Sequence, residues 1–101
     1  MKNIEELIQA YEIDTNGPAG MGRFEVLNML TNRDVIEERK GQLTTSQAAR
    51  LLFADEKLMS HHTQVIDECG DQTEFVRLRQ HDPSPSAWWW FLEQMPVEQF
   101  S

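Results

Sequence analysis

Apolar residues recur at helical spacing from the start of the chain. They stand at positions i, i+3, i+4 and i+7 and are Ile4, Leu7, Ile8 and Tyr11. This spacing places them on one stripe of a helix. Asn3 is a suitable N-cap, with Glu6 at the spacing of a capping box. The helix should end at residues 16–18, because the sequence Asn-Gly-Pro strongly disfavours the continuation of a helix.

A glycine-rich stretch over 14–22 separates this helix from the next. Its glycines do not have the spacing of a dinucleotide-binding or P-loop motif, and no strand precedes them, so a helix connection is expected. Residues 23–40 have helical propensity and one broad apolar face. Gly41 suits the position just after the helix C-terminus.

A third helical region covers 45–69. Thr44 and Gln47 have capping-box spacing at its start. An apolar stripe runs from Leu58 to Cys69, but the charged residues 55–57 interrupt the apolar face. The sequence therefore predicts either one bent helix or two short ones.

The C-terminal third contains two further elements. Residues 73–80 follow a capping pair and place Phe75 inward, yet part of the segment alternates as a strand does, so helix and strand both stay open. Residues 85–95 are expected to form a helix that stops before Pro96. The pattern as a whole predicts one all-α domain, residues 1–101, built as a bundle of about five helices with short loops.

Three consecutive tryptophans stand in this last predicted helix. On a helical wheel Trp90 lies about 200° from Trp88, so one core should not cover both. The helix then either lies in a groove between two others or presents tryptophan to a partner, where this residue type often anchors an interface. The partner-binding residues predicted on this basis are Trp89, Trp90, Glu93 and Phe100.

The net charge of −8 changes the choice of partner. A nucleic-acid surface needs clustered lysine and arginine, which no segment offers, so nucleic acid is an unlikely partner. A basic protein partner is compatible with the charge. No apolar run is long enough for a membrane span, no secretory signal is visible, and Cys69 is alone. These features predict a cytoplasmic protein without a membrane partner.

The segment LTTSQAARLL, residues 43–52, resembles the opening of many helix-turn-helix DNA-binding domains. The resemblance implies a DNA-binding regulator built on residues 44–69. It covers about ten residues, and Phe53-Ala54-Asp55 stands where such families have a glycine turn. The region that would be the recognition helix has one lysine and four acidic residues, which would repel DNA.

Metal chemistry gives another alternative, a metal-dependent hydrolase of the helical-bundle type. The candidate ligands include His61, His62 and Asp67, but neither HExxH nor paired CxxC motifs occur. Adjacent carboxylates such as Glu37-Glu38 cannot both face inward from one helix. We therefore assign no catalytic residue, metal or cofactor.

The sequence best fits a non-enzymatic protein–protein interaction module, an accessory or regulatory factor whose partner is another protein or a second copy of the chain. Mimicry of DNA by the acidic surface is a variant of this hypothesis.

Overall fold

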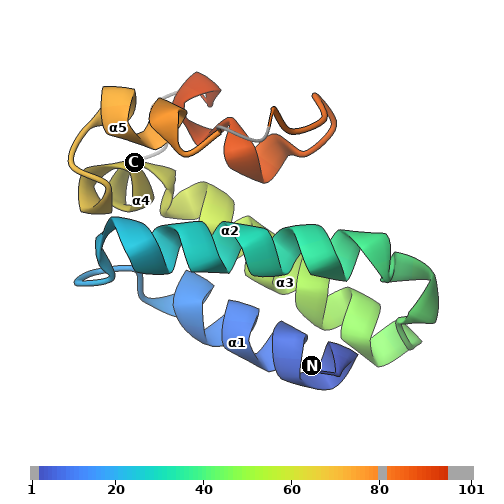
Figure 1. Cartoon of the computed structure of the whole chain (residues 1–101). Coiled ribbons are helices and arrows are strands. Elements are labelled where there is room, and N and C mark those ends of the chain that lie inside the picture. Colours follow the sequence, from blue (N-terminus) through green and yellow to red (C-terminus); the bar gives the residue numbers. More distant parts are fainter. Residues whose placement is uncertain (1–2, 80–81, 96–101) are drawn as a thin grey trace.

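The computed structural model describes residues 3–79 and 82–95 of the chain. Within these residues, five α-helices and three 3₁₀ turns follow one another (Figure 1). The helices are α1 (Ile4–Asn16), α2 (Gly22–Glu38), α3 (Thr45–Ser60), α4 (His62–Glu68) and α5 (Gln72–Arg77). The 3₁₀ turns are η1 (Lys40–Gln42), η2 (Trp88–Trp90) and η3 (Leu92–Gln94). The described residues contain no strand, so the prediction of an all-helical fold is confirmed and the strand alternative for 73–80 is wrong where it covers α5.

The predicted helix starts are confirmed by their hydrogen bonds. Both Asn3 and Thr44 form complete capping boxes with Glu6 and Gln47, respectively. Asp71 caps α5 by accepting a hydrogen bond from the backbone N–H of Glu74. Each cap satisfies amide groups that have no partner within the first turn of a helix.

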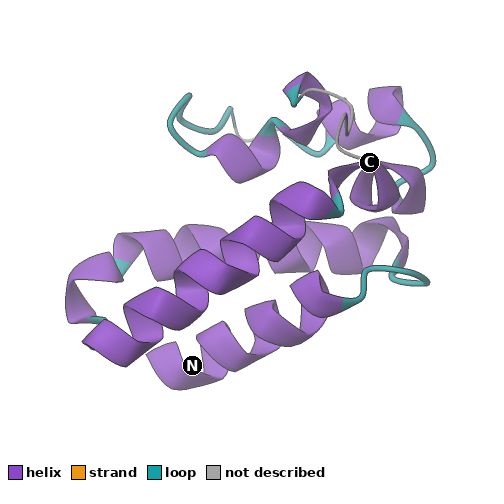
Figure 2. Ribbon diagram, turned by 180° about the vertical axis from the view of Figure 1, so that it is seen from behind, coloured by secondary structure: helices purple, strands orange, loops and turns teal. Residues whose placement is uncertain are grey.

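Helices α1 and α3 lie side by side and run in the same direction. Glu5 near the start of α1 contacts Gln47 near the start of α3, and Asn16 at the end of α1 contacts Lys57 near the end of α3. α2 packs against α1, and its other side is covered by α4 and η2 (Figures 1 and 2). α2 is therefore the central element of the fold.

One apolar core joins these layers. Its fully buried members come from every α-helix and from η2 and η3. The largest are Trp90, Tyr11, Phe75, Ile8, Met29, Leu30, Ile36, Leu58, Leu92, Val26 and Val65. None of the helices formed by residues 3–79 and 82–95 is long and apolar enough to cross a lipid bilayer.

The loop between α1 and α2 is tied to α4. Glu68 accepts a hydrogen bond from the backbone N–H of Gly22 at 3.0 Å. This bond, with a second from the backbone of Gly20, holds the pKa of Glu68 below its ordinary value. The glycine-rich stretch thus acts as the connection that its spacing predicts.

Region 45–69 forms two helices, and the break lies at His61 rather than at the charged residues 55–57. α3 continues through the charged residues because Asp55 is buried, with 7% of its surface exposed, and is bound by partners on other helices. A polar residue that interrupts the apolar face in the sequence is thus part of the interior in the structure.

The prediction of one helix over 85–95 is wrong. The segment forms the two short turns η2 and η3, with Phe91 between them in a non-helical conformation. An isolated helix of this length is marginal, and aromatic residues have only modest helix propensity. Burial of Trp89, Trp90 and Leu92 against the rest of the chain therefore decides the local conformation.

Candidate protein-binding surface

The tryptophans predicted to meet a partner are buried within a single chain. Trp89 and Trp90 are 3% and 1% exposed. Their indole N–H groups both donate to Oδ1 of Asp34 on α2, each at 2.8 Å. The expectation that one subunit cannot cover Trp90 is therefore wrong, because it assumed an α-helix, in which Trp88 and Trp90 would point in opposite directions.

Glu93 and Phe100, the other two residues predicted to bind a partner, do not provide an exposed aromatic surface either. The Glu93 side chain is 7% exposed and forms an ion pair with Arg79 at 2.5 Å. Phe100 lies outside the described residues. Trp88 and Phe91 are only partly buried and line a second hollow, with Pro83, Pro85 and Met95 among its other residues.

An internal polar network joins three helices beneath the surface. Arg33 of α2 donates to Asp55 of α3 through Nε at 2.9 Å and Nη2 at 3.0 Å, and the Tyr11 hydroxyl of α1 donates to Asp55 at 2.6 Å. The Arg33 guanidinium also lies over the Trp89 ring, 4.3 Å from its centroid. Buried charges need such pairing to offset desolvation, so the network fixes how the helices meet.

The environment of this network holds its members in defined protonation states. Burial raises the pKa of Tyr11 far above its ordinary value, and the negative charge of Asp55 raises it further. Burial lowers the pKa of Arg33, but the hydrogen bonds and charge of Asp55 outweigh that effect and the net pKa is raised. Tyr11 is therefore neutral and Arg33 charged at physiological pH. This arrangement is suited to holding the fold together.

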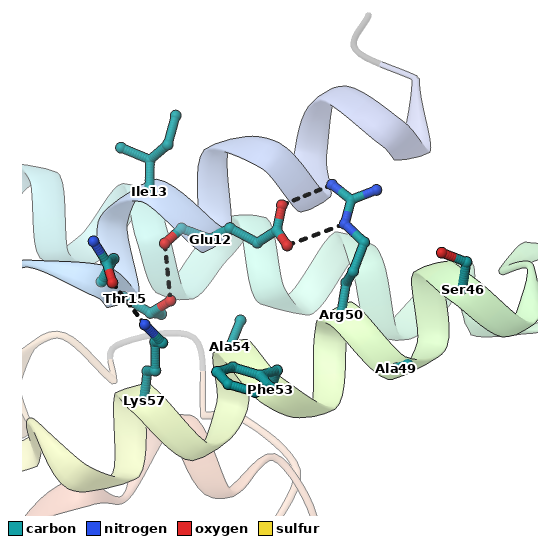
Figure 3. A pocket seen from close by; sticks show the side chains of 10 residues that line it. Glu12, Ile13, Thr15, Ser46, Ala49, Arg50, Phe53, Ala54 and Lys57 are labelled. Atoms are coloured by element: carbon teal, nitrogen blue, oxygen red, sulfur yellow. Dashed lines mark hydrogen bonds and ion pairs between the residues drawn. The ribbon is translucent and has the colours of Figure 1, made fainter.

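The groove between α1 and α3 is an apolar hollow bordered by exposed large apolar side chains (Figure 3). Its volume is about 560 Å³. Its lining residues come only from these two helices and are Glu12, Ile13, Thr15, Asn16, Ser46, Ala49, Arg50, Phe53, Ala54 and Lys57. We call this the α1–α3 groove.

Two polar bridges cross the α1–α3 groove. Arg50 donates to Glu12 through Nε (3.0 Å to Oε2) and Nη2 (2.7 Å to Oε1), and its Nη1 donates to Glu5. Further along, the Lys57 ammonium donates to the side-chain oxygen of Asn16 at 2.7 Å. Figure 3 shows the bridge between Glu12 and Arg50 reaching from one helix to the other, and Ala54 lying between Arg50 and Lys57 on α3. Ala54 lines the groove but is itself buried, with 2% of its surface exposed.

Large apolar side chains flank the same groove on both helices. Ile13 on α1 is 72% exposed and Phe53 on α3 is 64% exposed. The Lys57 ammonium lies 5.6 Å from the centroid of the Phe53 ring, at the distance of a cation–π contact. Leu52, next to Phe53, is also exposed. A face that gathers apolar residues inside a polar border has the composition of a protein contact surface.

The ion pair between Arg50 and Glu5 favours the charged form of both residues. Hydrogen bonds to Glu12 and then to Glu5 raise the pKa of Arg50 above its ordinary value. Hydrogen bonds from Gln47 and Arg50 lower the pKa of Glu5. Arg50 and Glu5 are therefore both ionised throughout the neutral pH range.

The histidines predicted as candidate metal ligands have separate local partners. Nδ1 of His61 lies 3.1 Å from the carbonyl oxygen of Thr15, and Nδ1 of His62 lies 2.8 Å from that of Met59. Within residues 3–79 and 82–95, no three His, Cys, Asp or Glu side chains gather in a metal-ligating arrangement. Asp67 is exposed on α4.

The region that resembles a helix-turn-helix opening has its own geometry. α3 and α4 are separated only by His61, and α4 has seven residues. Residues 53–55, which occupy the place of the expected turn, lie within α3. The turn position predicted from the resemblance is thus helical.

Sequence reasoning missed the α1–α3 groove, although a signal for it was present. Ile13 lies off the apolar stripe of α1, and Phe53 lies away from the buried positions Leu51, Ala54 and Leu58 of α3. Each is an apolar residue on a predicted solvent face. Only the pairing of the two helices shows that both border one hollow.

No protein-family model matches the chain, and no curated protein or solved structure is similar enough to match it.

Proposed function

We propose that this protein is a non-enzymatic protein–protein interaction module, an accessory or regulatory factor that binds its partner through the α1–α3 groove. The observation that carries the proposal is the apolar hollow with Ile13 and Phe53 exposed at its edges. The lone, buried Cys69 is compatible with the cytoplasmic location that the sequence predicts.

The physical argument is one of unused apolar surface. A phenylalanine that stays 64% exposed, as Phe53 does, contributes little hydrophobic stabilisation to the fold. It also adds to an exposed apolar patch, and such patches favour association with another molecule. Aromatic residues beside a pocket are typical anchors of protein interfaces, where removal of one side chain often costs more than about 1 kcal/mol of binding free energy. The groove, rather than the buried tryptophans, is the surface that such an interface would use.

The sequence-based alternatives rest on other parts of the chain. A DNA-binding regulator would use α3 and α4, and a metal-dependent hydrolase would use clustered carboxylates or histidines. No contact in the described part of the chain favours either alternative over the groove, so the interaction module is the function that we put forward.

The test compares two exposed phenylalanines. Phe53 borders the groove, whereas Phe24 lies at the start of α2, is 80% exposed and does not line the groove. Tagged wild-type protein, Phe53→Ser and Phe24→Ser would be recovered from the native cell after brief cross-linking. We expect a specific companion protein with the wild type and with Phe24→Ser, and its loss with Phe53→Ser.

Circular dichroism and thermal melts would confirm that both variants fold, which is expected because both side chains are exposed. A companion recovered equally with all three proteins would place the contact elsewhere. Recovery of no specific companion from cells that express the protein would contradict the proposal.

A further inference from the structure

One asparagine of the chain is followed by glycine. It is Asn16, the last residue of α1, which precedes Gly17, and both residues are exposed. The other asparagines, Asn3, Asn28 and Asn32, precede residues with long side chains. Glycine has no side chain to keep its backbone nitrogen away from the amide of the preceding asparagine. The Asn16–Gly17 pair is therefore the place where an intramolecular reaction between a side-chain amide and the backbone meets the least steric resistance.

The backbone nitrogen of Gly17 lies beyond the hydrogen-bond ladder of α1. Within residues 3–79 and 82–95, no group accepts a hydrogen bond from the Gly17 N–H, whereas the amides that follow α2 and α3 donate to carbonyls of the preceding turn. The carbonyl of Asn16 also stands outside the ladder, because the last four carbonyls of a helix have no partner within it. The backbone between the two residues can therefore rotate without breaking a hydrogen bond of the helix.

Lys57 of α3 polarises the side-chain amide of Asn16. Its ammonium donates to the amide oxygen Oδ1 at 2.7 Å. Among the described residues, no carboxylate forms an ion pair with this ammonium, whereas Arg50 at the other bridge is bound by both Glu12 and Glu5. The charge of Lys57 is therefore available to the amide oxygen. A cation at this distance stabilises the negative charge that develops on the oxygen when a nucleophile adds to the amide carbon.

We propose that Asn16–Gly17 is a site of spontaneous deamidation in which the Lys57 ammonium stabilises the reacting amide oxygen. Solvent removes the proton of the Gly17 N–H, and the nitrogen forms a bond to Cγ of Asn16. The Cγ–Nδ2 bond then breaks, and ammonia leaves with a proton from water, so that a cyclic succinimide remains. A water molecule opens this ring at either of its carbonyl carbons and leaves aspartate or isoaspartate. No group is oxidised or reduced.

The reaction changes the α1–α3 groove, since Asn16 and Lys57 both line it. The charged residues of the lining are Glu12, Arg50 and Lys57, one acid and two bases, which sum to +1. A carboxylate at position 16 removes this excess positive charge and turns the hydrogen bond to Lys57 into an ion pair. Isoaspartate also lengthens the backbone at the end of α1, because the chain then passes through the side-chain carbon. The groove thus acquires a different charge as the protein ages, whether or not it binds the partner of the proposed function.

The test follows the asparagines of the full-length protein during incubation for days at neutral and at mildly alkaline pH. Mass spectrometry of tryptic peptides detects the replacement of an NH₂ group by OH, and fragmentation locates it. Enzymatic methylation of isoaspartate detects the second product. The variants are Lys57→Met, Gly17→Ala and, as the control for the loss of a lysine, Lys40→Met, which lies outside the groove. Gly17→Ala should fold, because an added Cβ meets no atom within 4 Å, and circular dichroism would check all three variants.

We expect Asn16 to convert before any other asparagine, at a rate that rises with pH because the Gly17 nitrogen must lose its proton. Lys57→Met should slow the conversion at least about threefold and Gly17→Ala at least about tenfold, whereas Lys40→Met should change it by less than about twofold. Conversion of Asn16 in the chain unfolded by guanidinium chloride, but not in the native protein, would overturn the proposal. A rate for Lys57→Met that equals or exceeds the rate for Lys40→Met would overturn it as well.

Discussion

The guanidinium of Arg33 and the carboxylate of Asp55 face each other in the interior through two parallel hydrogen bonds of 2.9 and 3.0 Å. Only 4% of the Arg33 side chain and 9% of the Asp55 side chain are exposed. Tyr11 donates to the same carboxylate, and Trp89 covers the guanidinium. One pair thus links α1, α2, α3 and the tryptophan segment, and its stability determines whether the walls of the α1–α3 groove keep their places.

Removal of the carboxylate should be costly. We expect Asp55→Ala to lower the free energy of unfolding by about 3–5 kcal/mol, because it leaves a buried guanidinium without its main partner. The double variant Arg33→Met/Asp55→Leu should be more stable than Asp55→Ala, since it removes both charges. Urea unfolding followed by circular dichroism measures both. A loss below about 1 kcal/mol for Asp55→Ala would show that the pair is not a major support of the fold.

The two indoles should depend on Asp34. Asp34→Ala removes the acceptor shared by Trp89 and Trp90 and should cost about 1–3 kcal/mol, because buried donors lose their partner. The tryptophan emission should shift to longer wavelength as water reaches the rings. Asp34→Asn keeps an acceptor oxygen and should have the smaller effect on both readouts. Identical behaviour of the two variants would mean that the indole hydrogen bonds are not what holds this segment.

Tyr11 should resist ionisation until the protein unfolds. It is the single tyrosine of the chain, so the rise in absorbance on tyrosinate formation comes from this residue, once the change from the three tryptophans on unfolding is subtracted. Its pKa is raised by burial and by Asp55, so its contribution to stability is complete below about pH 10, the ordinary value of an unfolded chain, and is lost as the pH rises further.

In the native protein the tyrosinate signal should therefore appear together with the loss of helical circular dichroism. In urea it should appear near pH 10 without a structural transition. Ionisation of Tyr11 near pH 10 in a protein that keeps its helices would contradict the buried hydrogen bond to Asp55.

Cys69 should react slowly with thiol reagents. Burial raises the pKa of this thiol to about 11; Arg23 lowers it to a lesser degree, and Glu68 raises it further. The thiolate is the reactive form, so at pH 8 we expect labelling by a disulfide reagent at least about a hundredfold slower than in urea. Rapid labelling of the native protein would show that the α4 end opens readily.

The starts of α1, α3 and α5 were predictable because they depend on local spacing, whereas Gly41, expected just after the end of the second helix, lies within η1. The capping boxes at Asn3 and Thr44 need only two residues three positions apart, and α1 follows from a four-residue apolar stripe. The conformation of the tryptophan segment was not predictable in this way. It depends on Asp34, more than fifty residues away, as the acceptor for two indoles.

For the candidate protein-binding surface, too, the sequence shows the individual residues, and only the fold shows which of them lie together. Ile13 and Phe53 were visible as apolar residues in polar surroundings, but their separation along the chain gives no sign that they border one hollow. Asp55 looked like an interruption of an apolar face until Arg33 and Tyr11 were placed beside it. A charged residue belongs to the interior only where the fold supplies its partners.

The amino-acid order by itself determined an acidic, all-helical chain, because charge is a sum over residues and helical periodicity is a property of near neighbours. The tertiary structure alone decided which aromatic residues are hidden and which apolar residues remain outside. That choice depends on contacts between distant segments, and such contacts outweigh the weak local preferences of a short segment.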